Sequence, residues 1–486
     1  MRLKPVVFVP GLPGTMLIDA TAGNLELFPS LGALFSTSMR PTLIERLSGP
    51  EDPDHVDGVV AGEPIRDVVR IVGSLIDFSG TLKQASSLYD ILAALGYSID
   101  PPHPPNAGLF RAVGWDWRRP VDQGIVQTTL ADAIRTLHQA GGSPVTVICH
   151  STGGLVVRGV LEKQPELADL IERVIAIAIP WAGTLQSLPQ LAGQGGFGPL
   201  TAAETARIIG RSWAAFDLLP PDPAKTEMKD GEGDFNFFLD PAGHQASPLV
   251  ATGWIPTGAG GDPLRRRAAS ADQRLGRRQR SFELGGRSIE VVNLVGWGTA
   301  TLTSSQLDAN GRVTFQTSDQ GDGTIPRRSA AWLRGNGIST FMVPVGHYPG
   351  DDLERVHIVL WENQPVRDLL GVLLAGQPRP PYTYAAVDSL DATGVDVAQV
   401  HVRLVALDAA GQPLPNAFAT PVGLNPANLD RTQYLLDADG RGMMRLSRGN
   451  IPLVQGGLGR FGVQFHWQEN GAHRSSGPLI MNIQKS

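Results

Sequence analysis

A serine between an apolar run and two glycines is the first candidate for chemistry. The segment VTVICHSTGG (145–154) has a β-branched apolar stretch that ends in His-Ser and leads into a helix-like stretch. A serine on a tight strand-to-helix turn is the nucleophile elbow G-x-S-x-G, in which the two backbones nearly touch and small residues are required. Gly153 meets that requirement after Ser151, whereas the compact but larger Cys149 occupies the position of the first glycine.

Ser151 has a second interpretation, because serine is also a common helix N-cap. The buried type of strand, the His-Ser pair and the double glycine favour the nucleophile. A serine hydroxyl is a poor nucleophile until a base removes its proton. The interpretation therefore requires a histidine and an acid later in the chain, in the order Ser…Asp…His.

The acid candidates lie in SDQGDGTIP (318–326), which offers Asp319 and Asp322 after an apolar strand-like run. Asp322 stands between two glycines, so a tight loop would hold its carboxylate in place. A plain Gly-Asp-Gly turn or a cation loop is the alternative. A calcium loop would need more oxygen ligands than the local sequence supplies, and we expect no metal and no cofactor.

Two histidines follow the last strand-like run. His347 comes directly at its end in VGHYPG, and His357 begins HIVLWENQ, ahead of a final amphipathic stretch. Either position suits a base that reaches back to the elbow. The residues around them do not decide whether His347 or His357 is the base.

Short apolar runs alternate with amphipathic stretches along most of the chain. The runs at 5–11, 145–151, 174–180, 290–298 and 341–346 are β-branched and unbroken by charge. Strands that are apolar on both faces suit a parallel sheet covered by helices on both sides. The pattern predicts an α/β fold with a mostly parallel central sheet.

This alternation divides the chain into four parts. We expect the core to comprise residues 1–183 and 289–376, with a cap or lid insertion at 184–288. After a Pro-rich linker, alternating segments such as VHVRLVALD and RFGVQFHWQ predict an all-β, sandwich-like domain at 384–486.

Composition excludes several classes of protein. The chain has 486 residues, a net charge of −6 and one cysteine. A net negative charge gives no indication of nucleic-acid binding, and a single cysteine allows no intramolecular disulfide. No apolar stretch is long enough to span a membrane, and the N-terminus does not read as a signal peptide. We therefore expect a cytoplasmic location, with non-classical secretion left open, and the oligomeric state stays open.

Four motifs, in this order and together with the serine motif, resemble the lecithin:cholesterol acyltransferase family and its phospholipase relatives. FVPGLPGTML (8–17) resembles the N-terminal V-P-G-x-x-G-x-x-L signature, and GWDWRRP (114–120) the Y-D-W-R segment. IPWAG (179–183) is similar to P-W-x-G, and GDGTIP (321–326) to the acid loop G-D-G-T-V-P. The resemblance covers about residues 5–375.

The resemblance implies an α/β-hydrolase fold and assigns roles. It makes Asp322 the acid of a catalytic triad with Ser151. It favours His357 over His347 as the base, because an Asn and a terminal helix follow closely. The backbone N–H groups of Leu12 and Thr152 become the oxyanion donors, which stabilise charge that appears only in the transition state.

The expected activity is therefore that of a serine esterase, lipase, phospholipase or acyltransferase that acts on lipid-like acyl esters through an acyl-enzyme. The alternatives are a non-catalytic binding protein with this fold, and an esterase effector directed to its target by the β-domain. The Trp115–Arg118 stretch is expected to be a buried structural corner in which Asp116 pairs with Arg118.

The predicted lid has two further features. It is rich in apolar side chains, which we expect mostly to form the lid's own small core. It also carries an arginine-rich run, interpreted as a solvated, mobile loop, with peripheral contact to anionic lipid headgroups as the functional alternative. The apolar residues in or beside the lid are Trp181, Trp213, Phe216, Leu218, Leu219, Phe235, Phe237 and Phe238. The arginines are Arg265, Arg266, Arg267, Arg274, Arg277, Arg278 and Arg280.

Overall fold

The computed structural model describes most of the chain. The fold divides into two compact units, Met1–Phe341 with Asp352–Glu362, and Met342–Asp351 with Asn363–Ser486. The described residues are 3–29, 36–72, 75–83, 85–100, 107–194, 200–221, 238–244, 246–250, 254, 261–275, 281–284, 286–297, 299–318, 321–333, 337–344, 357–375, 382–391, 399–407, 414, 417–424, 433–436, 441–447, 451–452, 458–469, 472–476 and 478–484.

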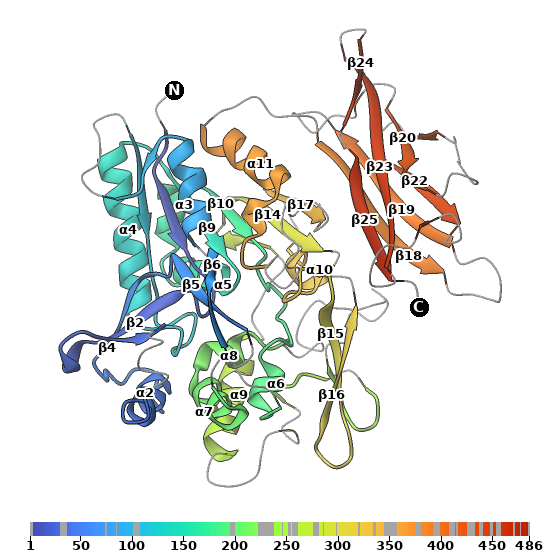
Figure 1. The fold of residues 1–486 in the computed structure, drawn as a ribbon. Helices are drawn as coiled ribbons and strands as arrows, with labels where there is room; N and C mark the ends of the chain where they lie inside the picture. Colours follow the sequence, from blue (N-terminus) through green and yellow to red (C-terminus); the bar gives the residue numbers. More distant parts are fainter. Residues whose placement is uncertain are drawn as a thin grey trace. The chain divides into compact units, whose positions relative to one another are not determined.

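A sheet of seven strands, counted within these described residues, forms the centre of the first unit (Figure 1). Each pairing along the path from β7 to β14 is parallel. The predicted fold class is confirmed: this is an α/β-hydrolase sheet. Its order is β17 (Ile338–Pro344), β14 (Glu290–Trp297), β10 (Ile171–Ile177), β9 (Val145–His150), β1 (Val6–Val9), β8 (Gly108–Ala112) and β7 (Tyr97–Ser98).

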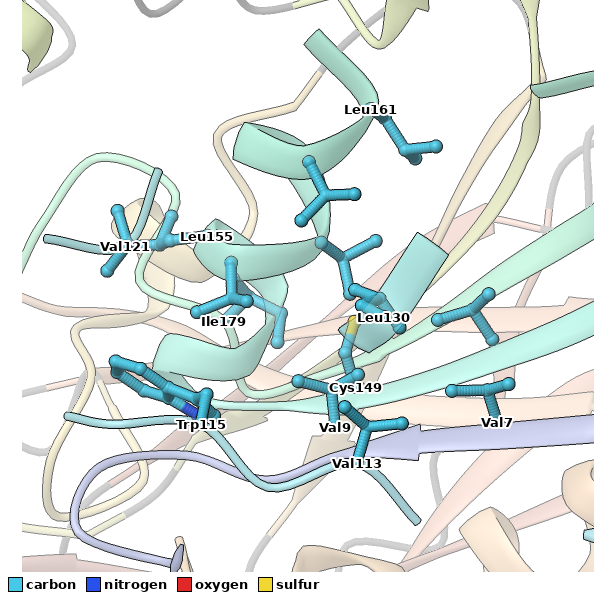
Figure 2. Close-up of a cluster of buried hydrophobic side chains, with 14 of the residues drawn as sticks. Val7, Val9, Val113, Trp115, Val121, Leu130, Cys149, Leu155, Leu161 and Ile179 are labelled. Carbon is cyan, nitrogen blue, oxygen red and sulfur yellow. The ribbon is translucent and has the colours of Figure 1, made fainter. Parts of the chain in front are cut away.

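Both faces of the sheet are covered, and the central strand β1 shows how. Val7 and Val9 enter a large buried cluster with Leu130 and other helix residues, part of which Figure 2 draws. Phe8, between them, points to the other face, where its ring packs edge-on against Tyr89 at 6.2 Å between centroids. Alternate side chains of a strand point to opposite faces, so an unbroken apolar run such as VVFV suits a strand buried on both sides.

Helices, turns and small sheets surround the central sheet. Among the described residues, no helix is both long and apolar enough to cross a membrane. The helices outside the cap are α2 (Arg40–Leu47), α3 (Ala85–Ala94), α4 (Ile125–Gly141), α5 (Thr152–Lys163) and α10 (Arg327–Ala330), with turns η1 (Ala20–Ala22), η2 (Pro165–Leu170) and η7 (Leu360–Glu362). The antiparallel strands are β2 (Thr15–Asp19), β3 (Leu25–Phe28), β4 (Val59–Pro64), β5 (Asp67–Val72) and β6 (Leu75–Lys83).

A separate group of elements, the cap, follows β10 in the chain and has its own buried cluster. Phe216, Leu219 and Phe238 pack there, as predicted, whereas Trp181 and Leu218 join the main core. Phe235 and Phe237 lie outside the described residues. The cap elements are α6 (Leu188–Leu191), α7 (Ala202–Arg211), α8 (Trp213–Asp217), β11 (Phe238–Leu239), α9 (Gly261–Leu275), β12 (Glu283–Leu284) and β13 (Arg287–Ser288), and β11 pairs with the hairpin β15 (Thr301–Leu307) and β16 (Val313–Ser318).

The segment that follows β8 forms the buried corner predicted from the sequence. Arg118 is fully buried, and its guanidinium contacts the carboxylates of Asp116 at 2.7 Å and Asp57 at 2.8 Å. Trp115 donates from its indole N–H to the carbonyl of Pro10 at 2.8 Å. The corner therefore holds the end of β1 in place, next to the turn at 11–14.

The second unit contains α11 (Gln364–Ala375) and the predicted all-β region. Each of two antiparallel sheets has a buried apolar face, with Val402, Leu404 and Met444 buried in one and Phe461 and Phe465 buried in the other. The sheets are β18 (Tyr382–Asp391), β19 (Gln399–Leu407) and β22 (Arg441–Ser447), and β21 (Tyr434–Leu435), β20 (Phe418–Val422), β23 (Leu458–Glu469) and β24 (Ala472–Ser475), with β25 (Leu479–Gln484) also on β23.

The single cysteine is part of the main core. Cys149 is fully buried at the end of β9 beside Val9 and Leu130 (Figure 2), and burial raises the pKa of its thiol. Thiolate is the reactive form of cysteine. We therefore expect native protein to react with Ellman's reagent at least roughly tenfold more slowly than guanidinium-unfolded protein. Release of one thiol equivalent at the same rate from both states would contradict this placement.

Candidate active site

Ser151 lies at the turn between β9 and α5 in a strained conformation. Its φ of 50° and ψ of −130° place it in a region that non-glycine residues rarely adopt. Its N–H bonds the carbonyl of Ile177 at 3.0 Å, and its carbonyl accepts from the N–H of Gly154 at 3.0 Å. These two bonds hold the turn, so the structure has the elbow geometry that the sequence predicted.

The start of α5 packs directly on the end of β1. A Cβ added to Gly153 would stand 2.6 Å from the carbonyl oxygen of Pro10 and also meet the carbonyl of Val9. Two backbones approach here with no room for a side chain. The requirement for a small residue after the serine is therefore real and is met by Gly153.

Cys149 takes the place of the elbow's first glycine because its side chain points away from the turn. Its Sγ lies 3.8 Å from the carbonyl of Ile175 within the main core. The requirement for glycine before the serine is thus relaxed, and the substitution leaves the turn intact.

Ser151, His357 and Asp322 are brought together in a chain of hydrogen-bonding groups. His357 Nε2 lies 3.0 Å from Ser151 Oγ, and His357 Nδ1 lies 2.8 Å from Asp322 Oδ2. All three side chains are buried. The Ser151 hydroxyl makes no capping bond to α5, so the N-cap interpretation does not describe it. His347 and Asp319 lie outside the described residues.

The loop after β16 fixes the orientation of Asp322. Its Oδ1 accepts from the backbone N–H groups of Thr324 at 3.0 Å and Ile325 at 2.7 Å, which leaves Oδ2 to His357. These bonds engage both carboxylate oxygens of a side chain that is fully buried. The carboxylate is therefore held in place to orient the imidazole.

The turn at 11–14 lies beside the elbow. A Cβ on Gly11 would stand 2.6 Å from Ser151 Cβ and 3.2 Å from Ser151 Oγ, so only glycine allows this approach. Gly14 donates to the Gly11 carbonyl at 2.7 Å, which closes the turn. Leu12 follows Gly11 directly and Thr152 begins α5. The two residues predicted as oxyanion donors thus flank the serine from two segments.

His150 is a site residue that the sequence analysis did not single out. Its Nε2–H donates to the backbone carbonyl of His357 at 2.8 Å, and its ring packs 4.9 Å from that of His357 and 5.0 Å from Trp361. Trp361 in turn donates to the Ser87 hydroxyl at 2.8 Å. The residue before the serine therefore holds the backbone of the histidine. In the sequence, only the position of His150 next to Ser151 indicated a role in the site, and it does not reveal that the carbonyl of His357 is its partner.

Burial determines the charge of His150. Burial, and then repulsion from His357, lower its pKa to about 3, while its bond to the His357 carbonyl acts in the opposite direction. His150 is therefore neutral near pH 7. A second imidazolium beside His357 is avoided, so a proton taken up by His357 meets no positive neighbour there.

Comparison with known proteins was made on sequence and on structure. Residues 77–238 match the family model described as lecithin:cholesterol acyltransferase. The predicted resemblance to this family is confirmed. The matched segment contains the serine motif, GWDWRRP (114–120) and IPWAG (179–183), and it ends before GDGTIP (321–326).

Relatives of the chain include lysosomal phospholipase A and acyltransferase of rat and of human. Each is 30% identical over 119 residues, which is 23% of this chain and 28% of the relative. The match thus spans well under a third of the relatives' length.

Two solved structures are similar at low identity. One, titled the Tle4–Tli4 complex, has 15% identity and a TM-score of 0.41, covering 70% of this chain and 91% of its own. The mature lipase BlEst2 of Bacillus licheniformis has 12% identity and a TM-score of 0.32, covering 77% and 92%. The fold assignment above rests on strand order and elbow geometry.

The segment IPWAG (179–183) and the residue after it bond to strand β14 and to the loop that contains Asp322. The Trp181 indole N–H donates to Asn293 Oδ1 at 3.1 Å, and the Thr184 hydroxyl donates to the carbonyl of Thr324 at 2.6 Å. Since Thr324 also binds Asp322, Thr184, the residue directly after the motif, supports the carboxylate from a distance in sequence.

The described part of the arginine-rich run is helical, which corrects the expectation of a loop, and its Arg267 is buried, which corrects the expectation of solvation there. Arg267 lies in helix α9 and is 2% exposed. Its guanidinium stacks 5.1 Å from the Trp213 ring and bonds the carbonyl of Gly210 at 3.3 Å. Burial, together with repulsion from Arg211, lowers its pKa to about 10. Arg267 therefore packs inside the cap and is not available to a headgroup. Arg266 is exposed, and Arg277, Arg278 and Arg280 lie outside the described residues.

The elbow packing gives a first prediction for this site. Gly153→Ala places a methyl group against backbone that cannot rotate away, and we expect a loss of roughly 1–3 kcal/mol or more in the free energy of unfolding, measured by chemical denaturation. Gly210→Ala in α7 is the matched control, since its new Cβ would meet only the movable end of Leu264. Equal stability of the two variants would show that the close approach at Gly153 does not exist.

The charge state of His150 gives a second prediction. Its folded pKa of about 3 lies below the unfolded value of 6.5, so the unfolded state binds the proton first and stability is lost as pH falls below about 6.5. Between pH 7 and pH 5, we expect the stability of the wild type to fall by about 2 kcal/mol relative to His150→Gln. Denaturation at a series of pH values measures the difference. Parallel curves for the two proteins would contradict a buried neutral imidazole.

Proposed function

We propose that the chain is a serine-dependent carboxylic ester hydrolase or acyltransferase that acts on lipid-like acyl esters through an acyl-enzyme. The observation that carries the proposal is the hydrogen-bonded chain from Ser151 through His357 to Asp322. The same three groups, in the same chain order, form the triad of α/β-hydrolases. A cytoplasmic location stays a prediction from the sequence.

In the first half-reaction, Ser151 Oγ attacks the ester carbonyl carbon while His357 Nε2 takes its proton. The carbonyl oxygen becomes an oxyanion, and the N–H groups of Leu12 and Thr152 are the donors proposed to stabilise it. Collapse of the tetrahedral intermediate breaks the bond to the leaving alcohol, which receives the proton from His357. The acyl group remains on Ser151.

In the second half-reaction, His357 removes a proton from an incoming hydroxyl group, whose oxygen attacks the acyl-serine. Water as the acceptor yields a carboxylic acid, and an alcohol yields a new ester. Ser151 recovers its proton from His357 in either case. The two activities therefore share one site and differ only in the acceptor.

Asp322 serves both halves of the cycle through His357. Its buried, doubly bonded carboxylate fixes the tautomer that carries the proton on Nδ1, which leaves Nε2 free to accept. It also stabilises the imidazolium that forms when the serine proton arrives. The neutral His150 on the other side adds no opposing charge.

The lipid-like substrate class is supported by the matched relatives, whose names contain phospholipase and acyltransferase. The cap's aromatic residues add little to it, because Phe216 and Phe238 pack in the cap's own cluster. The non-catalytic alternative rested on the departure at Cys149 together with the last hundred residues, to which the sequence assigns no role. Since the Cys149 side chain lies in the core and leaves the elbow intact, the first of these two reasons no longer holds.

The proposal predicts which residues turnover depends on. Ser151→Ala should abolish labelling by a fluorophosphonate probe, and Ser151→Ala, His357→Ala and Asp322→Asn should each lower kcat for p-nitrophenyl esters by roughly 10⁴-fold. His347→Ala is the control and should keep its turnover. Labelling that persists in Ser151→Ala would exclude the proposed nucleophile. Loss of turnover in His347→Ala alone would exclude His357 as the base.

A further inference from the structure

Two histidines on the β-rich unit lie close together, far in sequence from the candidate active site. They sit on the hairpin formed by β23 and β24, where His466 pairs with Ser475 and His473 with Gln468. Diagonal neighbours of this kind share one face of a sheet. Their nearest ring nitrogens, His466 Nδ1 and His473 Nε2, are 3.3 Å apart, which is within hydrogen-bonding distance.

His466 is held in place by strand β20 on its other side. Its Nε2 lies 3.0 Å from the Thr420 hydroxyl oxygen, and its ring stacks on Phe418 with centroids 4.8 Å apart and planes 16° apart. A proton on Nε2 that is donated to Thr420 leaves the Nδ1 lone pair facing His473. Since Thr420 can donate or accept at Nε2, the tautomer that donates to Thr420 is the one that leaves Nδ1 available as a ligand.

The spacing of the two nitrogens suits a bound metal ion. Zinc binds histidine nitrogen at about 2.0–2.1 Å in tetrahedral geometry, and two such ligands stand about 3.3–3.4 Å apart. His473 is exposed and His466 half-buried on the outer face of the sheet, so an ion can arrive from solvent.

We propose that His466 and His473 form a binding site for a divalent transition-metal ion such as zinc. Among the residues that the structure describes, no group of three or more His, Cys, Asp or Glu side chains is placed to hold a metal. The ion therefore takes two protein nitrogens, and water fills its other positions. Such a site exchanges its metal readily and favours copper and zinc over the oxygen-seeking magnesium and calcium. A bound metal ion would link the two strands of the β23–β24 hairpin and stabilise it.

The test is a calorimetric titration of the full chain with zinc chloride. We expect one equivalent to bind with a dissociation constant in the micromolar range and to raise the Tm. His473→Gln should weaken binding by about tenfold or more and remove the rise in Tm. Because His473 is exposed, this substitution leaves the fold intact. His55→Gln, at another exposed histidine, is the matched control and should bind zinc as the wild type does.

Three results would overturn the proposal. They are the absence of zinc binding, binding that is equally strong in His473→Gln, and equal heats from magnesium or calcium chloride. None of them bears on the ester chemistry at Ser151.

Discussion

The close approach of helix α5 to the end of strand β1 is the constraint on which the site depends. At Gly153 two backbones pack with no space for a Cβ, and at Gly11 the following turn touches Ser151 itself. These two contacts therefore place the serine, the positive end of a helix and the proposed oxyanion turn together. The strain of Ser151, at a φ of 50°, persists because the surrounding sheet and helix determine its position.

The second requirement is that buried polar groups find partners. Asp322 has bonds to both carboxylate oxygens, and His150 is neutral and bonded to the backbone of His357. Without these partners a buried carboxylate or imidazole would cost several kcal/mol or change its protonation. The same bonds that satisfy these groups also orient the candidate triad, so stability and geometry are served together.

The sequence predicted those features that local pattern controls. Unbroken apolar runs such as VTVICH marked buried strands, and His-Ser-Thr-Gly-Gly marked the elbow. Local pattern could not choose between His357 and His347, because the chosen base is 206 residues from Ser151 in sequence and meets it only through the fold. Family resemblance made that choice. The bond from His150 to the carbonyl of His357 could not be predicted for the same reason. Its partner is a backbone group that is distant in sequence, and no residue type marks such a group.

The sequence-based interpretation of the arginine-rich run failed at Arg267 because it considered the charge without the tertiary structure around it. A guanidinium can be buried when an aromatic face and carbonyl groups replace water, and Arg267 has Trp213 and the Gly210 carbonyl in that role. Arg118 follows the other route, burial with two carboxylates. Both arginines pack segments that are distant in sequence against each other. The corner at Arg118 also carries Trp115, whose indole holds Pro10 at the edge of the elbow. The corner that contains the buried Arg118 thus helps to set the position of a backbone turn on which acyl transfer would depend.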